Sequence, residues 1–226
     1  DDTDFTRVFT GSNCTSYYED RINIRDDKLY SLGFGTYLTD EVQLEVTAYY
    51  EDKNGYGVSP DSYTNTLSIY TDQAAAGLDV VHPRGVQYGL STVGGEREGL
   101  VGSVTWFMGD HKLEAGGWIE EDTYNRTQAR LNKTGGSADG EVIYDEVAYY
   151  RRDYTAVRDT TQLFIKDNFS MMDDDLLLEV GFKSLSIDYS LDGYSDYDDY
   201  EIDGEPGYGP QSVDAEYTDN FLPMGG

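Results

Sequence analysis

Strict alternation of apolar and polar side chains is the feature that most constrains how this chain folds. Over residues 42–50, apolar side chains occupy every second position, and polar side chains such as Glu45 lie between them. A period of two is typical of a β-strand with one apolar and one polar face. A matching run covers residues 30–38, and only a short polar connection over 39–41 separates the two runs. The pattern therefore predicts a β-hairpin over about 28–50.

The same pattern recurs along the chain with a spacing of roughly 65 residues. Two further hairpins are expected over about 99–120 and 160–186, and the start of another strand over 217–226. Long polar connections precede and separate these elements. The expected loops cover residues 1–27, 51–98, 121–158 and 187–216. Because tight turns and long loops alternate, all the turns are expected on one rim of the sheet and all the loops on the other.

This asymmetry predicts an all-β fold: an antiparallel up-and-down meander of long hairpins, forming part of a transmembrane β-barrel with short turns on one rim and long loops on the other. The apolar parity of the first two hairpins holds no charged residue, whereas the other parity holds Glu45, Glu114 and Glu120. Such exclusion is expected in a barrel, because a lipid-facing Arg or Lys at the midplane costs about 2–4 kcal/mol. A water-soluble sheet that packs one face on a core also alternates, and it is the alternative.

The composition excludes several classes of protein. The chain has 16 Lys and Arg against 44 Asp and Glu, a net charge of −28, which argues against nucleic acid as a partner. Its 21 tyrosines argue against simple disorder. The single cysteine, Cys14, excludes an internal disulfide and a thiolate metal cluster. Since the sequence contains no nucleophile elbow, phosphate loop or zinc-spaced ligand set, the chain is not expected to be an enzyme.

Three stretches resemble the β-barrel part of TonB-dependent outer-membrane receptors. They are YLTDEVQLEVTAYYEDKNGYG at 37–57, GLVGSVTWFMGDHKLEAGGWIEED at 99–122 and TTQLFIKDNFSMMDDDLLLEVGFKSLSIDY at 160–189. The segment DNFLPMGG at 219–226 is similar to the Phe-x-Pro segment that enters a late barrel strand in that family. Nothing in the chain resembles the family's N-terminal plug domain, its energy-coupling box or its terminal aromatic residue. The resemblance therefore implies an internal fragment of the barrel domain.

The resemblance also implies a function, a location and partners. It implies a receptor in the bacterial outer membrane for the energy-coupled uptake of a scarce nutrient, such as a siderophore or an oligosaccharide. The expected partners are outer-membrane lipid and lipopolysaccharide, a small-molecule or oligosaccharide cargo, and a TonB-type energy-coupling protein that acts through a plug. No cofactor is required. Loops as acidic as these favour neutral or cationic cargo, because surface potential governs the local concentration of a charged ligand.

The expected loop over 187–216 is dense in acids and tyrosines and contains no Lys or Arg. Oxygen ligands at this density suit Ca²⁺. The candidate calcium ligands are Asp192, Asp196, Asp198, Asp199, Glu201 and Asp203. Their spacing does not match the twelve-residue helical calcium loop, so a solvated loop that gathers cations loosely is the alternative. Tyrosine offers a large rigid face with a polar tip, which makes Tyr194, Tyr197 and Tyr200 candidates for ligand contact.

Two adjacent cations, Arg151 and Arg152, lie in the expected loop over 121–158. They are candidates for clamping a carboxylate or phosphate, because a guanidinium donates two parallel hydrogen bonds to such a group. Cross-strand ion pairs on a tall hairpin are the alternative. For the chain as a whole, two other functions stay open: a secreted, acidic, calcium-dependent β protein that binds carbohydrate, and a structural or adhesive surface protein.

Overall fold

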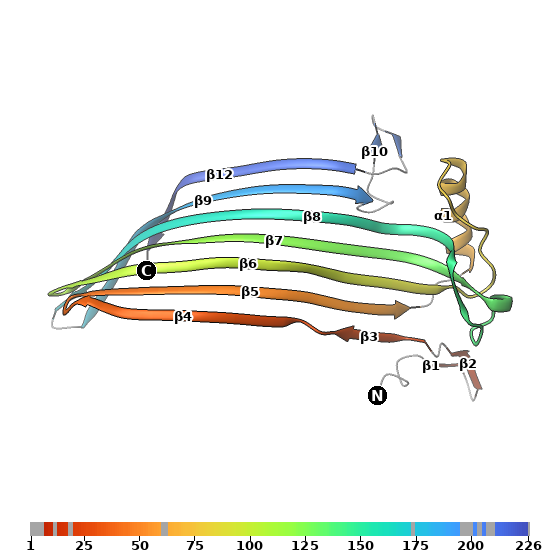
Figure 1. The fold of residues 1–226 in the computed structure, drawn as a ribbon, viewed down its shortest axis with the longest axis horizontal. Coiled ribbons are helices and arrows are strands. Elements are labelled where there is room, and N and C mark those ends of the chain that lie inside the picture. The colour runs from red at the N-terminus through yellow and green to blue at the C-terminus, as the bar shows by residue number, and fades with distance from the viewer. Residues whose placement is uncertain are drawn as a thin grey trace.

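A computed structural model of the chain describes residues 7–10, 13–17, 20–59, 63–172, 175–194, 201–202, 205–206 and 211–225. Most of these residues lie in one large antiparallel sheet (Figure 1). Its strands are β3 (Ile22–Arg25), β4 (Lys28–Thr39), β5 (Val42–Ser59), β6 (Tyr88–Met108), β7 (His111–Lys133), β8 (Val142–Met171), β9 (Leu176–Tyr194) and β12 (Gln211–Gly225). Two small hairpins lie outside it, formed by β1 (Arg7–Thr10) with β2 (Asn13–Tyr17) and by β10 (Glu201–Ile202) with β11 (Glu205–Pro206).

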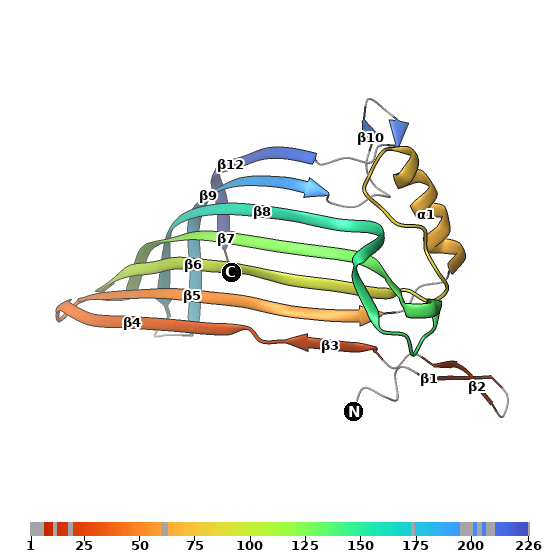
Figure 2. The same ribbon diagram turned by 45° about the vertical axis from the view of Figure 1, so that its right-hand side comes forward.

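From β5 to β9 each strand pairs with the next along the chain, and β12 is the last strand in the order, paired with β9. Both β3 and β4 pair with β5, so together they form one interrupted edge of the sheet, and β12 forms the other. This confirms the expected all-β, antiparallel up-and-down meander. Over the described residues the sheet is open and does not close into a barrel. Figure 2 shows that it is curved, with β8, β9 and β12 bending away at the end that carries the tight turns.

The tight turns fall where the sequence predicts them. Met108 pairs with His111, so the turn between β6 and β7 consists of two residues. The first of these, Gly109, has a φ of 58°, a left-handed conformation that glycine adopts without steric cost. The turn between β4 and β5 is equally short, and the side-chain oxygen of Thr39 accepts hydrogen bonds from the backbone N–H groups of Glu41 and Val42.

The expected loops are wrong in extent, because the strands continue far beyond the apolar alternation. β5 extends to residue 59 and β6 begins at 88, so most of the expected loop over 51–98 is sheet or helix. β7 and β8 likewise leave only 134–141 of the expected loop over 121–158. β9 and β12 shorten the loop expected over 187–216, and β3 lies within the one expected over 1–27. The physical reason is that strand pairing relies on backbone hydrogen bonds, and cross-strand polar pairs sustain it where apolar residues stop.

The end of the sheet opposite the tight turns carries the helix α1 (Tyr63–Ala75) and a short 3-10 helix (Thr134–Gly136). The side chain of Gln73 fixes α1 to β8: its Nε2 donates to the carbonyl of Tyr150, and its Oε1 accepts from the Tyr150 N–H at 3.0 Å. Ile69 of α1 and Tyr149 of β8 are both buried. A small core therefore exists at this end of the sheet, away from the apolar alternation.

Candidate functional site

The sheet has two chemically different faces, which we call the apolar face and the polar face. Residues paired directly across strands share a face, so the register assigns every paired residue to one of them. The apolar face holds Val46 of β5, and the polar face holds its neighbour Thr47. The two faces differ most over the half of the sheet that carries the tight turns.

Large hydrophobic side chains stand exposed on the apolar face in this half of the sheet. On the outer strand β4, Leu32 is 78% exposed and Phe34 is 61% exposed. The same face continues across β6 to β9 with further exposed hydrophobics. These are Leu100, Val104, Trp106, Ile119, Leu163, Ile165, Val180 and Phe182. No described element packs over them, so they form a continuous band of uncovered apolar surface, which we call the apolar band.

A row of carboxylates ends the apolar band on the side away from the tight turns. The row starts beside Tyr30 and Tyr50, which are paired on β4 and β5. It then crosses five adjacent strands, and each member pairs directly with the next. The members are Glu98, Glu121, Asp159, Asp188 and Glu216. All five are exposed, and we call them the carboxylate row.

The apolar band has a constant depth along the strands. On β5 the interval from Val42 to Tyr50 contains nine residues, its two limits included, and the direct pairing carries the same interval across to β9. Between these limits, no described residue of β4 to β9 places a charged side chain on the apolar face. Asp167 lies at the limit near the turns, where its carboxylate contacts His111 Nδ1 at 2.6 Å. The band is thus uniform in depth and free of charge within it.

At the level of the carboxylate row, the polar face carries a ladder of alternating charge. Glu51 of β5 pairs with Arg97 of β6, which pairs with Asp122 of β7, which in turn pairs with Arg158 of β8. Arg97 NH2 lies 2.8 Å from Glu51 Oε2, and Arg158 NH2 donates to Asp122 Oδ2 at 3.2 Å. The side chain of Lys53 also binds Asp122. Opposite charges therefore satisfy one another here, whereas like charges lie side by side on the other face.

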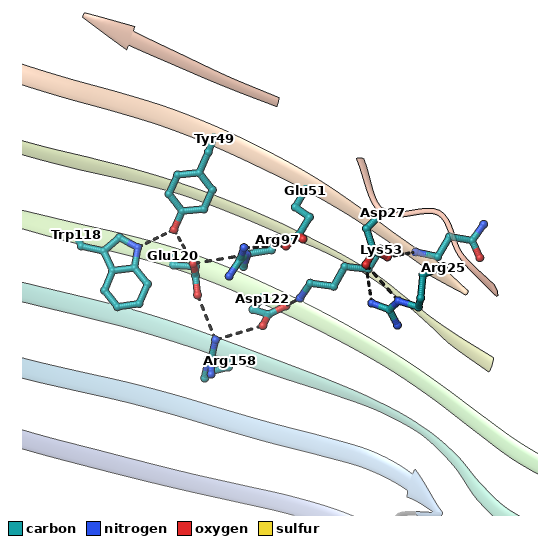
Figure 3. Close-up of polar contacts among 11 residues, drawn as sticks. Arg25, Asp27, Tyr49, Glu51, Lys53, Arg97, Trp118, Glu120, Asp122 and Arg158 are labelled. Atoms are coloured by element: carbon teal, nitrogen blue, oxygen red, sulfur yellow. Dashed lines mark hydrogen bonds and ion pairs between the residues drawn. The ribbon is translucent and has the colours of Figure 1, made fainter. Parts of the chain in front are cut away.

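Glu120 lies at the centre of the polar face (Figure 3). Its side chain is only 3% exposed. Tyr49 donates its hydroxyl hydrogen to Glu120 Oε2 at 2.5 Å and accepts one from Trp118 Nε1 at 2.6 Å. Arg158 donates to the other oxygen, Oε1, at 3.2 Å. A carboxylate buried to this degree needs such partners, because an unpaired buried charge is strongly destabilising.

A glycine makes the contact between Tyr49 and Glu120 possible. Tyr49 on β5 and Glu120 on β7 flank Gly99 on β6 in one cross-strand row. The tyrosine side chain lies directly over this glycine, since a Cβ added at Gly99 would come within 2.3 Å of the Tyr49 hydroxyl oxygen. Only a residue without a side chain leaves room for the ring to cross β6.

The residues predicted to bind ligands do not form one group. Arg152 pairs with Gln128 on the polar face, and Arg151 is the extra residue where the register between β7 and β8 shifts. Tyr194 pairs with Asp153, which follows Arg152 in β8 and therefore lies on the opposite face. Tyr194 and Arg152 are thus separated by the sheet. Two further candidates, Tyr197 and Tyr200, lie outside the described residues.

The predicted calcium site is only partly within the described chain. Asp192 is exposed near the end of β9, and Glu201 lies in β10. The other candidates, Asp196, Asp198, Asp199 and Asp203, fall outside the described residues. Among the residues that are described, no three acidic, histidine or cysteine side chains are placed to hold a metal ion. The calcium site stays a prediction.

The carboxylate row is not predicted from the sequence, and cross-strand ion pairs are expected over 121–158 only as the alternative to an anion clamp at Arg151 and Arg152, without the members of the charge ladder. Glu98 and Glu121 lie at the borders of the loops expected over 51–98 and 121–158, and their adjacency depends on the pairing of β6 with β7. The signal that would have found them is the continued period of two beyond the apolar residues, read together with the two-residue turn that fixes the register.

Comparison with protein-family models and with curated proteins identifies no relative of this chain. No protein-family model matches the sequence, and no curated protein matches it. Within the described residues, no helix has the length and apolar character needed to cross a membrane. The resemblance to TonB-dependent receptors therefore rests on the sequence pattern.

Proposed function

We propose that this chain forms part of the wall of an outer-membrane β-barrel receptor that takes up a scarce nutrient, such as a siderophore or an oligosaccharide. The apolar face meets lipid and the polar face lines the lumen. The observation that carries the proposal is the apolar band: exposed, continuous over adjacent strands, and free of charge between its limits. Water-soluble monomers rarely expose contiguous apolar patches beyond a few hundred Å².

The depth of the band supports this placement. A transmembrane β-strand needs about 9–11 residues when tilted by about 45°. The interval from Val42 to Tyr50 contains nine residues with its limits included, and the paired intervals on β6 to β9 have the same length and each end on a member of the carboxylate row. Aromatic side chains lie at both limits, Trp106 at one and Tyr30 with Tyr50 at the other. Aromatic girdles at the two interfaces are typical of outer-membrane barrels.

The strands beyond the carboxylate row support a receptor rather than a bare pore. β8 contains 30 residues, so it extends well past the interval from Asp159 to Asp167 that delimits the band. In the proposed orientation, this extension and α1 stand outside the membrane, where a ligand arrives. Uptake then depends on a plug and on a TonB-type energy-coupling protein, in line with the family that the sequence resembles.

A soluble sheet would need a second layer over the apolar face. The helix α1 covers no part of the apolar band, because its described contacts are with the far end of β8, at residues such as Tyr150. The band would then be exposed to water over several strands, where each Å² of apolar surface costs about 25 cal/mol relative to burial. Lipid removes this cost without a second layer.

The two tryptophans provide a direct test. Trp106 lies on the apolar face and is 44% exposed, whereas Trp118 lies on the polar face and donates to Tyr49. In lipid vesicles, the Trp118→Phe variant reports on Trp106 alone, and the Trp106→Phe variant reports on Trp118 alone. Brominated lipid chains should quench the fluorescence of Trp106 strongly and that of Trp118 weakly.

The position of the bromine sharpens the test. Trp106 lies at one limit of the band, so lipids brominated near the headgroup should quench it more than lipids brominated near the chain end. The same protein in water without lipid or detergent should aggregate. Equal quenching of both tryptophans, or a monomer that stays soluble without detergent, would remove the membrane-wall proposal.

A further inference from the structure

The polar face contains a second feature that the proposed function does not use. Near the end of β5, three arginines border a hollow of about 550 Å³. They are Arg21, Arg25 and Arg126. In a chain with 16 basic and 44 acidic residues, such a grouping of cations is unusual. No carboxylate is found among the described residues that line this hollow.

The register explains how these cations meet. Arg25 of β3 pairs with Gly55 of β5, Gly55 pairs with Val93 of β6, and Val93 pairs with Arg126 of β7. The two arginines therefore belong to one cross-strand row on the polar face. Gly55 lies between them and has no side chain, so the floor of the hollow there is backbone.

The next row along the strands has the same character. Asn23 pairs with Gly57, and Gly57 pairs with Ser91. The asparagine amide and the serine hydroxyl are neutral groups that can donate hydrogen bonds at the border of the hollow, and Ser59 adds a third. A second glycine again leaves the floor open.

One of the arginines has unused hydrogen-bonding capacity. The Nε of Arg126 is buried and has no hydrogen-bond partner among the described residues. Buried polar atoms are usually satisfied, so this N–H group is available to donate to a bound group. Arg25, by contrast, donates from Nε and NH2 to Asp27 at 3.2 and 2.7 Å, which fixes its guanidinium at the border.

We propose that this hollow binds the oxyanion group, a carboxylate or a phosphate, of a small anionic ligand. Guanidinium groups match the geometry of both groups, and their charge-assisted hydrogen bonds are about twice as strong as neutral ones. A volume of about 550 Å³ lies within the usual range for small-molecule sites. The role of this site in uptake rests on the proposed function, but the binding itself does not.

The net charge of −28 does not prevent such binding. The acid nearest to the row of Arg25 and Arg126 is Asp27, which forms an ion pair with Arg25. Beyond Asp27, the nearest acids on the polar face along β5 and β7 are Glu51 and Asp122, each four residues from the row. Four residues span about 13 Å of strand, which exceeds the Debye length of about 8 Å at physiological salt. Glu51 and Asp122 are also neutralised by ion pairs. Among the described residues, Arg126 has no ion-pair partner, so its guanidinium contributes an unneutralised positive charge at the hollow.

The test uses the full chain in a nonionic detergent and calorimetric titration with inorganic phosphate and, separately, with citrate, at constant ionic strength. The wild-type protein should bind at least one probe saturably, and the comparison shows whether phosphate or carboxylate is preferred. Arg126→Gln should weaken binding at least about tenfold, because a hydrogen bond to a charged group contributes about 1.5–3 kcal/mol. The matched control is Lys183→Gln, which removes one charge from the same face on β9 and should change the affinity less than twofold.

A second variant removes the space without removing charge. Gly57→Val places a branched side chain on the floor; a Cβ there meets Asn23 Oδ1 at 3.4 Å and the Ile22 carbonyl oxygen at 3.6 Å, so the strand tolerates it. This variant should retain the far-ultraviolet circular dichroism spectrum and lose binding.

The proposal is overturned if neither probe binds, if Lys183→Gln weakens binding as much as Arg126→Gln, or if Gly57→Val binds like wild type. Tryptophan quenching by brominated lipid distinguishes this failure from failure of the membrane placement, because it does not depend on the hollow.

Discussion

Replacement of Leu163 by arginine is the most direct energetic test of the membrane placement. Leu163 is 58% exposed, and it lies midway between the limits of the apolar band on β8, four residues from Asp159 and four from Asp167. In the proposed orientation it contacts lipid near the bilayer midplane. Its neighbour Gln162 lies on the polar face and offers a matched control, since Gln162→Arg introduces the same charge one residue away.

A lipid environment and a water environment around residue 163 predict very different losses of stability for the arginine variant. Arginine on the lipid face of a barrel costs about 2–4 kcal/mol at the midplane and about 0–1 kcal/mol near the interfaces. On a water-exposed surface, the same change alters stability by less than about 0.5 kcal/mol. Leu163→Arg should therefore lower the free energy of unfolding in lipid vesicles by about 2–4 kcal/mol more than Gln162→Arg does. Denaturant titration in vesicles of zwitterionic lipid, followed by tryptophan fluorescence, measures this difference.

The test is decided by how the loss of stability depends on the depth of the arginine in the proposed bilayer. Thr161 shares the apolar face with Leu163 but lies two residues from Asp159, so Thr161→Arg should cost clearly less than Leu163→Arg. If all three arginine variants unfold with the same free energy, the apolar face does not meet lipid. A larger loss for Thr161→Arg than for Leu163→Arg would also contradict the proposed depth.

Three other predictions concern the polar face. Gly99→Ala should destabilise the protein by about 1–3 kcal/mol in denaturant titration, because its Cβ would overlap the Tyr49 hydroxyl; wild-type stability would show that the ring moves aside at no cost. Glu120→Gln should cost about 1–3 kcal/mol, since it removes the charge that Arg158 binds; an unchanged midpoint would contradict this. The Arg25 hydrogen bond holds the pKa of Asp27 below its ordinary value of 3.8. The resulting stability is therefore fully present well above the ordinary pKa and is lost as the pH falls through the lowered folded-state pKa, so the unfolding midpoints of wild type and Asp27→Asn should converge in acid; a difference that stays constant as the pH falls through the acid range would refute it.

The fold class could be predicted because apolar and polar side chains alternate strictly over residues 42–50 and in the segments paired with them. It could not predict where the strands end. The apolar period stops at Tyr50, yet β5 continues to residue 59. Beyond Tyr50, Glu51 pairs with Arg97. Glycines such as Gly55 occupy positions at which a side chain would otherwise continue the alternation of apolar and polar residues. A strand stabilised by ion pairs and backbone hydrogen bonds has no hydrophobic signature.

The candidate sites were harder to predict than the fold. Arg25 and Arg126 lie on strands far apart in the sequence, and only the register through Gly55 and Val93 brings them into one row. A shift of one residue in any of these ladders would move one arginine to the other face. Residue types alone favoured Arg151 and Arg152, because they are adjacent in sequence. Adjacent residues in a strand point to opposite faces, which makes adjacency a poor guide to a shared site.

In the proposed membrane orientation, the carboxylate row limits how deeply the wall can sit in a bilayer. Its five acids lie at one level across five strands, so movement of the wall toward the membrane centre by two residues, about 7 Å, would carry all of them into hydrocarbon together. Each buried charge is expensive, and the five penalties would be incurred at once. In the proposed membrane orientation, the row would fix the immersion depth cooperatively, and a bilayer of the wrong thickness would have to deform around the protein rather than shift it. In that orientation, the same lipid thickness would set how far the strands beyond the row stand above the bilayer surface.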